Sequence, residues 1–166
     1  MIYYSNIYIP ELKRSFLIAK NEKGVCNIEF SSGKKMFLKM LSGRNDGVIK
    51  YSPARLKSEM RQIKEYFSGK RKKFTMKLDM NGTPFQKKVW NAIAGVGYGK
   101  TASYAGLAKK IRNPKALRAV GSACGKNPLP IVIPCHRIIS KDGSIGGFGG
   151  GVSLKRKMLA VEKVRL

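Results

Sequence analysis

Three prolines interrupt the segment between residues 127 and 137, whose sequence is Asn-Pro-Leu-Pro-Ile-Val-Ile-Pro-Cys-His-Arg. Proline fixes φ and removes a backbone hydrogen-bond donor, so this segment cannot form a regular helix. The sequence therefore predicts a stiff, extended loop. Because its third proline directly precedes Cys135 and His136, a thiol and an imidazole lie where the backbone has little freedom.

The segments before this loop have the start and stop signals of helices. Thr83-Pro84 begins one that stops at the glycines of residues 95–99, Ser103 can cap a second, and Asn113-Pro114 begins a third. The two shorter helices, joined by a few residues, predict a helix-turn-helix. The apolar residues at helical spacing in the three segments are Phe85, Val89, Trp90, Ile93, Leu107, Ile111, Leu117, Val120 and Cys124.

After the proline-containing loop, the sequence predicts a turn and one more helix. Asp142-Gly143 is typical of a turn, and the glycines between residues 146 and 151 predict a flexible segment. Ser153 suits the N-cap of the final helix.

The first half of the chain has a different pattern. Short apolar stretches at residues 1–9, 15–19 and 25–30, separated by Asn, Gly and Ser, predict a small antiparallel sheet. Ser52 and Pro53 then predict the N-cap and first turn of a helix that ends at Gly69. Its apolar stripe would consist of Leu56, Met60, Ile63 and Phe67.

The run of four cations at residues 70–73 is too charged to pack, and Asn81-Gly82-Thr83-Pro84 adds turn signals. We therefore predict a sheet-and-helix domain over residues 1–78 and a mainly helical domain over residues 79–166. The fold class is mixed α/β (α+β), with the helix-turn-helix in the second domain.

The charge of the chain indicates its partner. Lys and Arg number 34 and Asp and Glu 9, which gives a net charge of +25. Such an excess repels itself unless a polyanion screens it, so nucleic acid is the first candidate and an anionic membrane the second. No apolar run reaches the roughly 18 residues of a membrane-spanning helix.

The cysteines indicate a reducing compartment. Cys26, Cys124 and Cys135 are odd in number and far apart, which argues against a disulfide framework. The N-terminus also lacks the basic-then-apolar order of a secretory signal, so we expect a cytoplasmic or nuclear protein, with the cytoplasm preferred. A single histidine and the absence of a Cys-x-x-Cys pair argue against a zinc finger.

The most reactive pair in the sequence is Cys135 followed by the only histidine, His136. A thiolate is the nucleophilic form of cysteine, and a nearby base raises its population. The alternative is an inert buried cysteine beside a surface histidine. A catalytic imidazole usually has a carboxylate partner, and from residue 80 onward the only acids are Asp142, in the predicted turn, and Glu162, on the last helix. By spacing alone, Glu162 could equally be a surface charge.

The second helix of the predicted helix-turn-helix, residues 114–123, exposes small residues and Arg118. Helices that read the major groove usually carry long polar side chains, whereas a small-residue surface suits close approach to the minor groove, with one arginine able to enter the base stack. An ordinary amphipathic helix is the alternative. Tyr104, at the start of the preceding helix, could simply be a half-buried aromatic.

Together these residues resemble the O6-alkylguanine-DNA alkyltransferase family. The resemblance rests on Pro134-Cys-His-Arg-Ile138, on Arg118-Ala-Val-Gly121 and Asn127-Pro before it, and on the glycine-rich run and Glu162 after it. It covers roughly residues 80 to 165 with the family's spacing. The first half resembles the family only in its size and its strand-then-helix order.

The resemblance implies DNA repair by direct reversal: a single-turnover methyltransferase that flips the damaged nucleotide and moves its alkyl group irreversibly to its own cysteine. Cys135 would be the acceptor, His136 its base through a water molecule, Glu162 the group that orients the imidazole, and Asn127 the tie between helix and loop. The DNA-binding residues would be Tyr104, Arg118, Ala119 and Gly121. The substrate pocket would include Ile138, Phe148, Gly149 and Lys155.

The implied partner is double-stranded DNA containing O6-alkylguanine, bound by a monomer that needs no metal or other cofactor and no membrane. One departure from the family is that Phe148 and Gly149 replace a more usual tyrosine and serine, which removes a hydroxyl near the O6 atom. Two other functions compete: a basic helix-turn-helix module that binds nucleic acid without chemistry, and a cysteine hydrolase with the same Cys-His pair.

Overall fold

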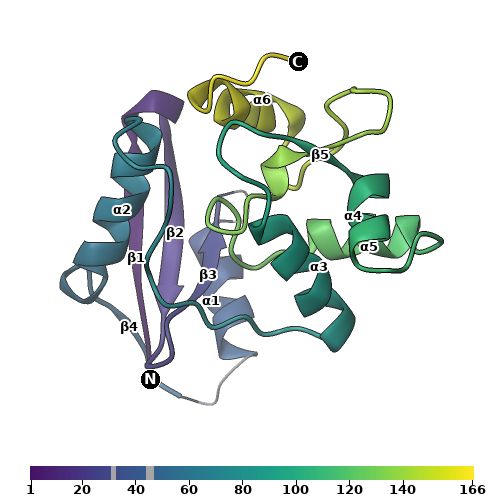
Figure 1. Cartoon of the computed structure of the whole chain (residues 1–166). Helices are drawn as coiled ribbons and strands as arrows, with labels where there is room; N and C mark the ends of the chain where they lie inside the picture. The colour runs from purple at the N-terminus through teal and green to yellow at the C-terminus, as the bar shows by residue number, and fades with distance from the viewer. Residues whose placement is uncertain (31–32, 44–46) are drawn as a thin grey trace. The chain divides into compact units, whose positions relative to one another are not determined.

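A change of structure near residue 80 divides the computed structural model into two units, Met1–Met80 and Asn81–Leu166 (Figure 1). The structure describes residues 1–30, 33–43 and 47–166. The first unit is a sheet with two α-helices and the second is mainly helical, as the sequence pattern predicts. None of the helices in these ranges is long and apolar enough to cross a membrane.

The sheet of the first unit has the strand order β3-β2-β1-β4. Its members are β1 (Ile2–Ile9), β2 (Arg14–Lys20), β3 (Val25–Glu29) and β4 (Ile49–Tyr51). The first three strands are antiparallel and confirm the predicted antiparallel sheet. The fourth strand pairs with β1 in parallel, which the sequence pattern did not predict. A parallel pair needs a crossover, and helix α1 (Lys34–Ser42), also not predicted, lies within it.

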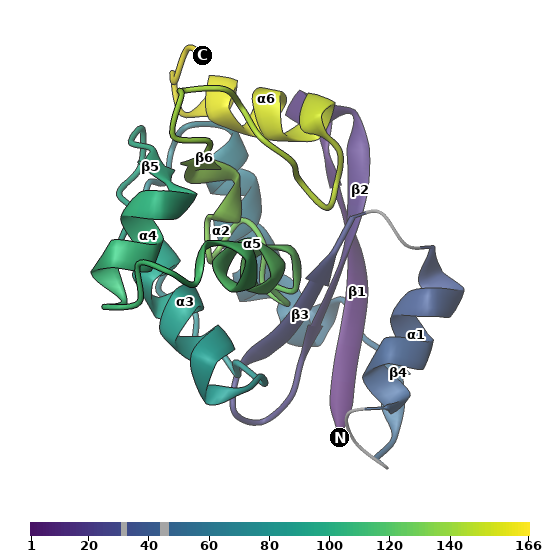
Figure 2. The ribbon, with the colours of Figure 1, turned by 90° about the vertical axis from the view of Figure 1, so that its right-hand side faces the viewer.

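Two helices cover opposite faces of this sheet (Figure 2). On one face Phe37 and Leu41 of α1 pack into a core with Ile2, Tyr4 and other buried residues. On the other, Phe67 of α2 (Lys57–Phe67) contacts Phe16 of β2, with ring centroids 5.9 Å apart. Because successive side chains of a strand point to opposite faces of the sheet, each strand contributes to both of these hydrophobic cores.

The helix after the sheet begins differently from the prediction. Ser52 is not its N-cap, because the Ser52 amide continues the strand pairing by donating to the Tyr4 carbonyl (2.9 Å). A 3-10 turn at Ala54–Leu56 follows Pro53, and α2 begins at Lys57. A second 3-10 turn, Pro10–Leu12, links β1 to β2.

The first unit extends past the predicted boundary at residue 78 because its last residues lie along β3. The Val25 amide donates to the Lys77 carbonyl (2.9 Å), and the Asp79 amide donates to the Val25 carbonyl (2.8 Å). Gly24, with φ of +146°, permits this approach, since a Cβ there would lie 2.4 Å from the Lys77 oxygen.

The second unit is built from four α-helices and a small parallel sheet. These are α3 (Pro84–Ala94), α4 (Tyr104–Lys110), α5 (Leu117–Gly125), α6 (Val152–Val161), β5 (Ala102–Ser103) and β6 (Ile138–Ile139). Thr83 forms a capping box with Gln86, and Ser103 accepts from the Gly106 amide, so both predicted N-caps are confirmed.

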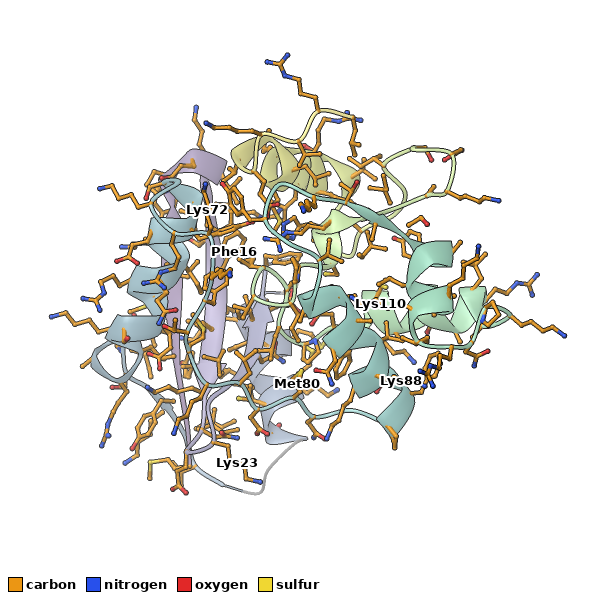
Figure 3. The ribbon with its side chains drawn as sticks, in the orientation of Figure 1. Phe16, Lys23, Lys72, Met80, Lys88 and Lys110 are labelled. Carbon is orange, nitrogen blue, oxygen red and sulfur yellow. The ribbon has the colours of Figure 1, made fainter. Side chains whose placement is uncertain are left out.

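Side chains hold α3 against the helix-turn-helix formed by α4 and α5. The Trp90 indole donates to the Ala123 carbonyl of α5 (2.8 Å). The Lys110 ammonium at the end of α4 donates to the Ala92 carbonyl (3.4 Å; Figure 3). Three helices therefore share one core, and the outer side of α5 is left exposed.

Two predictions about helix starts in the second unit, and one about the shape of a loop, were wrong. Helix α5 begins at Leu117, because residues 113–116 form a turn, and Leu117 is 48% exposed instead of lying in the apolar stripe. Ser153 does not cap α6, since Gly151, with φ of +90°, is the N-cap. The proline-containing loop forms no regular helix, as expected, but it is not extended: the Ile133 amide donates to the Leu129 carbonyl (2.8 Å), and the loop ends in a 3-10 turn at Cys135–Arg137.

Candidate active site

Cys135 opens the 3-10 turn at the end of the proline-containing loop and is 8% exposed. Its amide donates to the Ile133 carbonyl (2.8 Å), which fixes the backbone. Its Sγ accepts a hydrogen bond from the Asn127 Nδ2 (3.2 Å). The thiol therefore has a defined direction and a polar partner.

Asn127 joins the end of α5 to this loop through both its backbone and its side chain. Its amide donates to the Cys124 carbonyl (3.3 Å), and its Oδ1 accepts from the Leu129 amide (3.0 Å). Its Nδ2 also reaches the Ile133 carbonyl (2.8 Å). Any shift of Asn127 would therefore move both helix and thiol.

The loop contains one strained residue. Ile131 has φ of +78° although it is β-branched and only 1% exposed. Such a conformation is unfavourable for isoleucine and persists only where the surroundings determine it, commonly beside functional groups. Ile131 lies midway between Leu129 and Ile133, the two residues whose backbone the Asn127 side chain contacts.

His136 is fully buried, which rules out the surface histidine of the inert alternative. Its Nε2 lies 2.8 Å from the Glu162 Oε1, and Glu162 is itself only 2% exposed. The structure thus brings together the only histidine and one of the two acids of the second unit. The surface position considered for Glu162 is wrong, because the C-terminal end of α6 directs this carboxylate inward.

Arg137 is the residue that the sequence analysis missed. Its Nε and Nη2 donate to Glu162 at 2.9–3.0 Å, and its guanidinium lies 5.9 Å from the centre of the Tyr98 ring. The Glu162 Oε2 also accepts from the Gly99 amide (2.9 Å). The carboxylate therefore has a buried counter-charge, which makes its burial tolerable.

These contacts had only weak signals in the sequence. Arg137 directly follows the Cys-His pair, and the Gly95–Gly99 run predicts only the end of a helix. The run in fact supplies the Gly99 amide to the site, together with the Val96 carbonyl, which accepts from Arg137 Nη1.

Burial determines the protonation states of the pair. It raises the pKa of the Cys135 thiol, against the opposing hydrogen bond from Asn127. It lowers the pKa of His136, against the opposing hydrogen bond and charge of Glu162. Both groups are therefore neutral at neutral pH: a thiol that must lose its proton stands beside an imidazole on the next residue that can accept one.

Lys155 of α6 is fully buried beside this site. Its ammonium donates to the carbonyls of Ile138 (2.5 Å), Ile145 (2.6 Å) and Gly147 (3.2 Å). It therefore holds the glycine-rich loop to strand β6, which follows the 3-10 turn at Cys135–Arg137. Burial lowers the pKa of Lys155 to about 8, while the neighbouring Cys135 and Cys124 act in the opposite direction.

The pKa of Lys155 predicts a pH-dependent contribution to stability. Below pH 8 the side chain is charged in the folded and the unfolded chain. Between pH 8 and its ordinary value of 10.5 the unfolded chain binds more protons, so the contribution to stability rises with pH. Relative to Lys155→Met, the unfolding free energy of the native protein should rise by at most about 1.4 kcal/mol per pH unit in this window.

Urea unfolding can measure this difference. The fluorescence of Trp90, the single tryptophan, reports the second unit. Burial raises the pKa of Cys124 to about 12, so this thiol makes stability fall as the pH rises. Because the native protein and Lys155→Met both contain Cys124, its contribution largely cancels in the difference between their unfolding free energies. A difference that stayed constant from pH 8 to pH 10 would contradict the prediction.

Tyr104 and the predicted pocket residues lie around the same loop. The Tyr104 hydroxyl donates to the Gly147 carbonyl (3.4 Å), and Lys155 lies 5.9 Å from the centre of the Tyr104 ring. Phe148 is half-buried and Gly149 is exposed. The Ile138 carbonyl accepts a hydrogen bond from Lys155, and the Cys135 carbonyl accepts one from the Ile138 amide.

Helix α5 presents the predicted DNA-binding residues outward. Arg118 and Ala119 are exposed, and Gly121 is partly exposed with open space where a Cβ would lie. Ser122 continues this surface of small side chains. The buried side of the same helix contributes Cys124 and leads directly into Asn127, so α5 links an open surface to the thiol.

A neutral buried thiol, an imidazole held by a carboxylate, and an adjoining helix-turn-helix define a cysteine-dependent protein with a nucleic-acid-binding architecture. Residues 84–164 match the family model of the 6-O-methylguanine DNA methyltransferase, DNA binding domain. Residues 12–80 match that of the 6-O-methylguanine DNA methyltransferase, ribonuclease-like domain. The chain belongs to the 6-O-methylguanine DNA methyltransferase family.

Curated relatives and solved structures agree. The methylated-DNA–protein-cysteine methyltransferase of Methanosarcina barkeri is 39% identical over 150 residues, which cover 90% of this chain and 91% of the relative. A structure of the Mycobacterium tuberculosis OGT in complex with DNA has a TM-score of 0.84 at 32% identity, covering 97% of this chain and 92% of that one. The enzyme of Pyrococcus kodakaraensis gives 0.71 at 26% identity, over 99% and 100%.

Proposed function

We propose that this protein repairs DNA by direct reversal, transferring the alkyl group of O6-alkylguanine in duplex DNA to Cys135. The observation that carries the proposal is the buried thiol, held by Asn127 and followed directly by the His136–Glu162 pair. The names of the relatives support a methyltransferase over a binding module without chemistry. The DNA complex of a protein with the same fold supports duplex DNA as the partner.

The chemistry follows from the protonation states. When substrate is bound, the thiol proton moves to His136, through a bridging water molecule, and Glu162 stabilises the imidazolium. The sulfur attacks the alkyl carbon, the C–S bond forms, and the bond between carbon and O6 breaks with its electron pair left on guanine. Guanine takes up one proton, so the reaction balances. The product thioether is a poor leaving group, and each chain reacts once.

The O6 atom lies inside the duplex, so the nucleotide has to leave the stack, at a cost of a few kcal/mol that weakened pairing reduces. We assign this step to α5. Its small residues, including Ala119 and Gly121, allow close approach to the minor groove, and Arg118 fills the gap in the stack. Tyr104 would contact the rotated nucleotide beside the glycine-rich loop.

The pocket for the extruded base would lie between this loop and the acceptor turn. The family resemblance assigns the Cys135 and Ile138 carbonyls to the exocyclic amine of guanine, and a carbonyl oxygen that accepts one hydrogen bond can accept a second. Phe148 and Gly149 would form one wall, and Lys155 would keep that wall in place through its carbonyl contacts. Exposed backbone amides of the glycine run can replace the missing hydroxyl at O6.

The mass of the intact protein tests the reaction. After incubation with a duplex containing O6-methylguanine, we expect each chain to gain the mass of one CH2 group and to gain nothing on further incubation. Peptide mapping should place the methyl group on Cys135. A methyl group on Cys26 or Cys124, or methylated DNA left intact, would contradict the proposal.

Arg118→Ala tests the extrusion step. We expect repair of duplex DNA to slow by roughly 10- to 100-fold, because the gap in the stack is left unfilled. Reaction with a free O6-alkylguanine base, which needs no extrusion, should keep its rate. Lys115→Ala, which removes an exposed charge just before α5, is the matched control and should change both rates little. Equal losses on both substrates with Arg118→Ala would refute the stack-filling role.

We also propose that the protein acts as a monomer in the cytoplasm. Its three cysteines are free thiols, which suits a reducing compartment. The acceptor role of Cys135 requires this state.

A further inference from the structure

The positive charge of the chain is not confined to the unit that contains Cys135. The first unit has 18 Lys and Arg against 7 Asp and Glu, a net charge of +11. The proposed repair reaction uses none of these residues. This surplus therefore has no assigned partner.

Part of the surplus gathers in one groove of about 920 Å³ between α2 and the end of β1. We call it the basic groove. Its six cations are Lys20, Arg55, Lys57, Arg61, Lys64 and Lys70. In Figure 3 side chains of α2 extend away from the strands of the sheet.

Three of these cations form a stripe along α2. Lys57, Arg61 and Lys64 follow one another at intervals of four and three residues, so they share one face of the helix. With a rise of about 1.5 Å per residue, the stripe spans roughly 10 Å, a length over which a DNA strand presents several phosphates. All three are exposed, and the Arg61 side chain is 71% exposed.

The three carboxylates in the groove, Glu11, Glu59 and Glu65, offset only half of the charge of its six cations. Glu59 is paired with Lys20 (2.8 Å). Glu65 is paired with Arg71 (2.8 Å) and lies 3.7 Å from Arg61. Within the described part of the chain, no carboxylate lies within ion-pair distance of Lys57, Lys64 or Lys70.

The other side chains of the groove fit phosphates better than a protein or a membrane. Ser58 supplies a hydroxyl donor, whereas the Ser68 hydroxyl donates to the Glu65 carbonyl (3.1 Å). Among the described residues that line the groove, Tyr8 is the one large apolar side chain that is more than half exposed, so the groove has little apolar surface to offer. Protein interfaces usually have an apolar centre, and a membrane-bound helix needs an apolar face to insert.

We propose that the basic groove is a second DNA-binding surface, which contacts the phosphate backbone of duplex DNA without reading its sequence. Such contacts would supply affinity during the search for a lesion, while selectivity stays with the second unit. Because the two units belong to one chain, contact by either raises the local concentration of duplex for the other.

The test is the salt dependence of binding to an undamaged duplex, measured with the full chain. Each phosphate contact contributes about 0.9 to the slope of log K against log salt concentration. In the variant Lys57→Gln, Arg61→Gln, Lys64→Gln we expect the slope to fall by roughly 2 to 3. Since no lesion is present, the result is independent of the alkyl-transfer reaction.

A matched control removes the same charge from the same unit. Lys23, Lys35 and Lys39 are exposed and do not line the groove; Lys23 lies in the turn between β2 and β3 (Figure 3). The variant Lys23→Gln, Lys35→Gln, Lys39→Gln should leave the slope close to that of the native protein. Equal effects of the two triple variants would attribute binding to overall charge and overturn the proposal.

Lysine acetylation gives a local measurement on the native chain. Duplex DNA should protect Lys57, Lys64 and Lys70 from an acetylating reagent, but not Lys35 or Lys39. Vesicles containing phosphatidylserine serve as the competing polyanion. If the vesicles protect these lysines and the duplex does not, the groove binds membranes and the proposal is wrong.

Discussion

Replacing Cys135 with serine is expected to abolish alkyl transfer, by at least about 10⁴-fold, without loss of binding to duplex DNA. A hydroxyl has almost the size of a thiol, so the contacts with Asn127 and Ile133 should survive. A serine proton, however, is far less acidic, and the neutral oxygen is a poor nucleophile. The measurement is the methyl content of the protein after reaction with O6-methylguanine duplex, together with its affinity for that duplex.

Cys124→Ser is the matched control. Cys124 is also buried, at 7% exposure, and lies close enough to Cys135 for the two to interact electrostatically. Burial raises its pKa to about 12, and Cys124 is not followed by the histidine that we assign as the base of Cys135, so it should stay a protonated thiol. We expect this variant to accept a methyl group at nearly the native rate. Transfer that persisted in Cys135→Ser would show that the acceptor had been misassigned.

Elements with local signals could be predicted from the sequence. Thr83 with Gln86, and Ser103, mark helix starts through contacts within three residues, and both N-caps form as predicted. The strands β1 to β3 are joined by short turns, so their pairing is also local. In each case the residues that decide the structure are close together in the sequence.

The elements that the sequence did not predict depend on contacts between residues that are far apart in the sequence. Strand β4 pairs with β1 across more than 40 residues, and Phe37 of α1 is buried only because the sheet face is there to receive it. Ser52 looked like an N-cap, but its amide is bonded to Tyr4. At this position a hydrogen bond to a residue distant in sequence determines the structure, although the local sequence favours a helix start.

The residues of the candidate site show the same difference between local signals and contacts distant in sequence. Cys135 and His136 are adjacent and could be singled out directly, whereas Glu162 was one of two possibilities until the family resemblance selected it. Arg137 was missed because its role depends on Glu162, which lies 25 residues away. Because acids are rare in this sequence, Glu162 can be recognised as unusual. The sequence does not show which of the many cations pairs with it.

The second large effect should come from Arg137→Met. This substitution keeps most of the side-chain volume but leaves the Glu162 carboxylate buried without its counter-charge. Breaking such a pair typically costs about 3–5 kcal/mol. We expect a loss of this size in the unfolding free energy of the second unit, measured in urea by Trp90 fluorescence. Arg156→Met, on the exposed side of α6, should change stability by no more than about 0.5 kcal/mol.

Adding Glu162→Gln to Arg137→Met separates stability from chemistry. The amide has the shape of the carboxylate, can still accept from the Gly99 amide or from His136, and leaves no buried charge, so part of the stability should return. Alkyl transfer should nevertheless stay slower by about 10²-fold or more, because a neutral amide cannot stabilise the imidazolium that forms when His136 takes the thiol proton. If the rate recovered with the stability, Glu162 would serve only to hold the fold, and its role in stabilising the imidazolium would have to be abandoned.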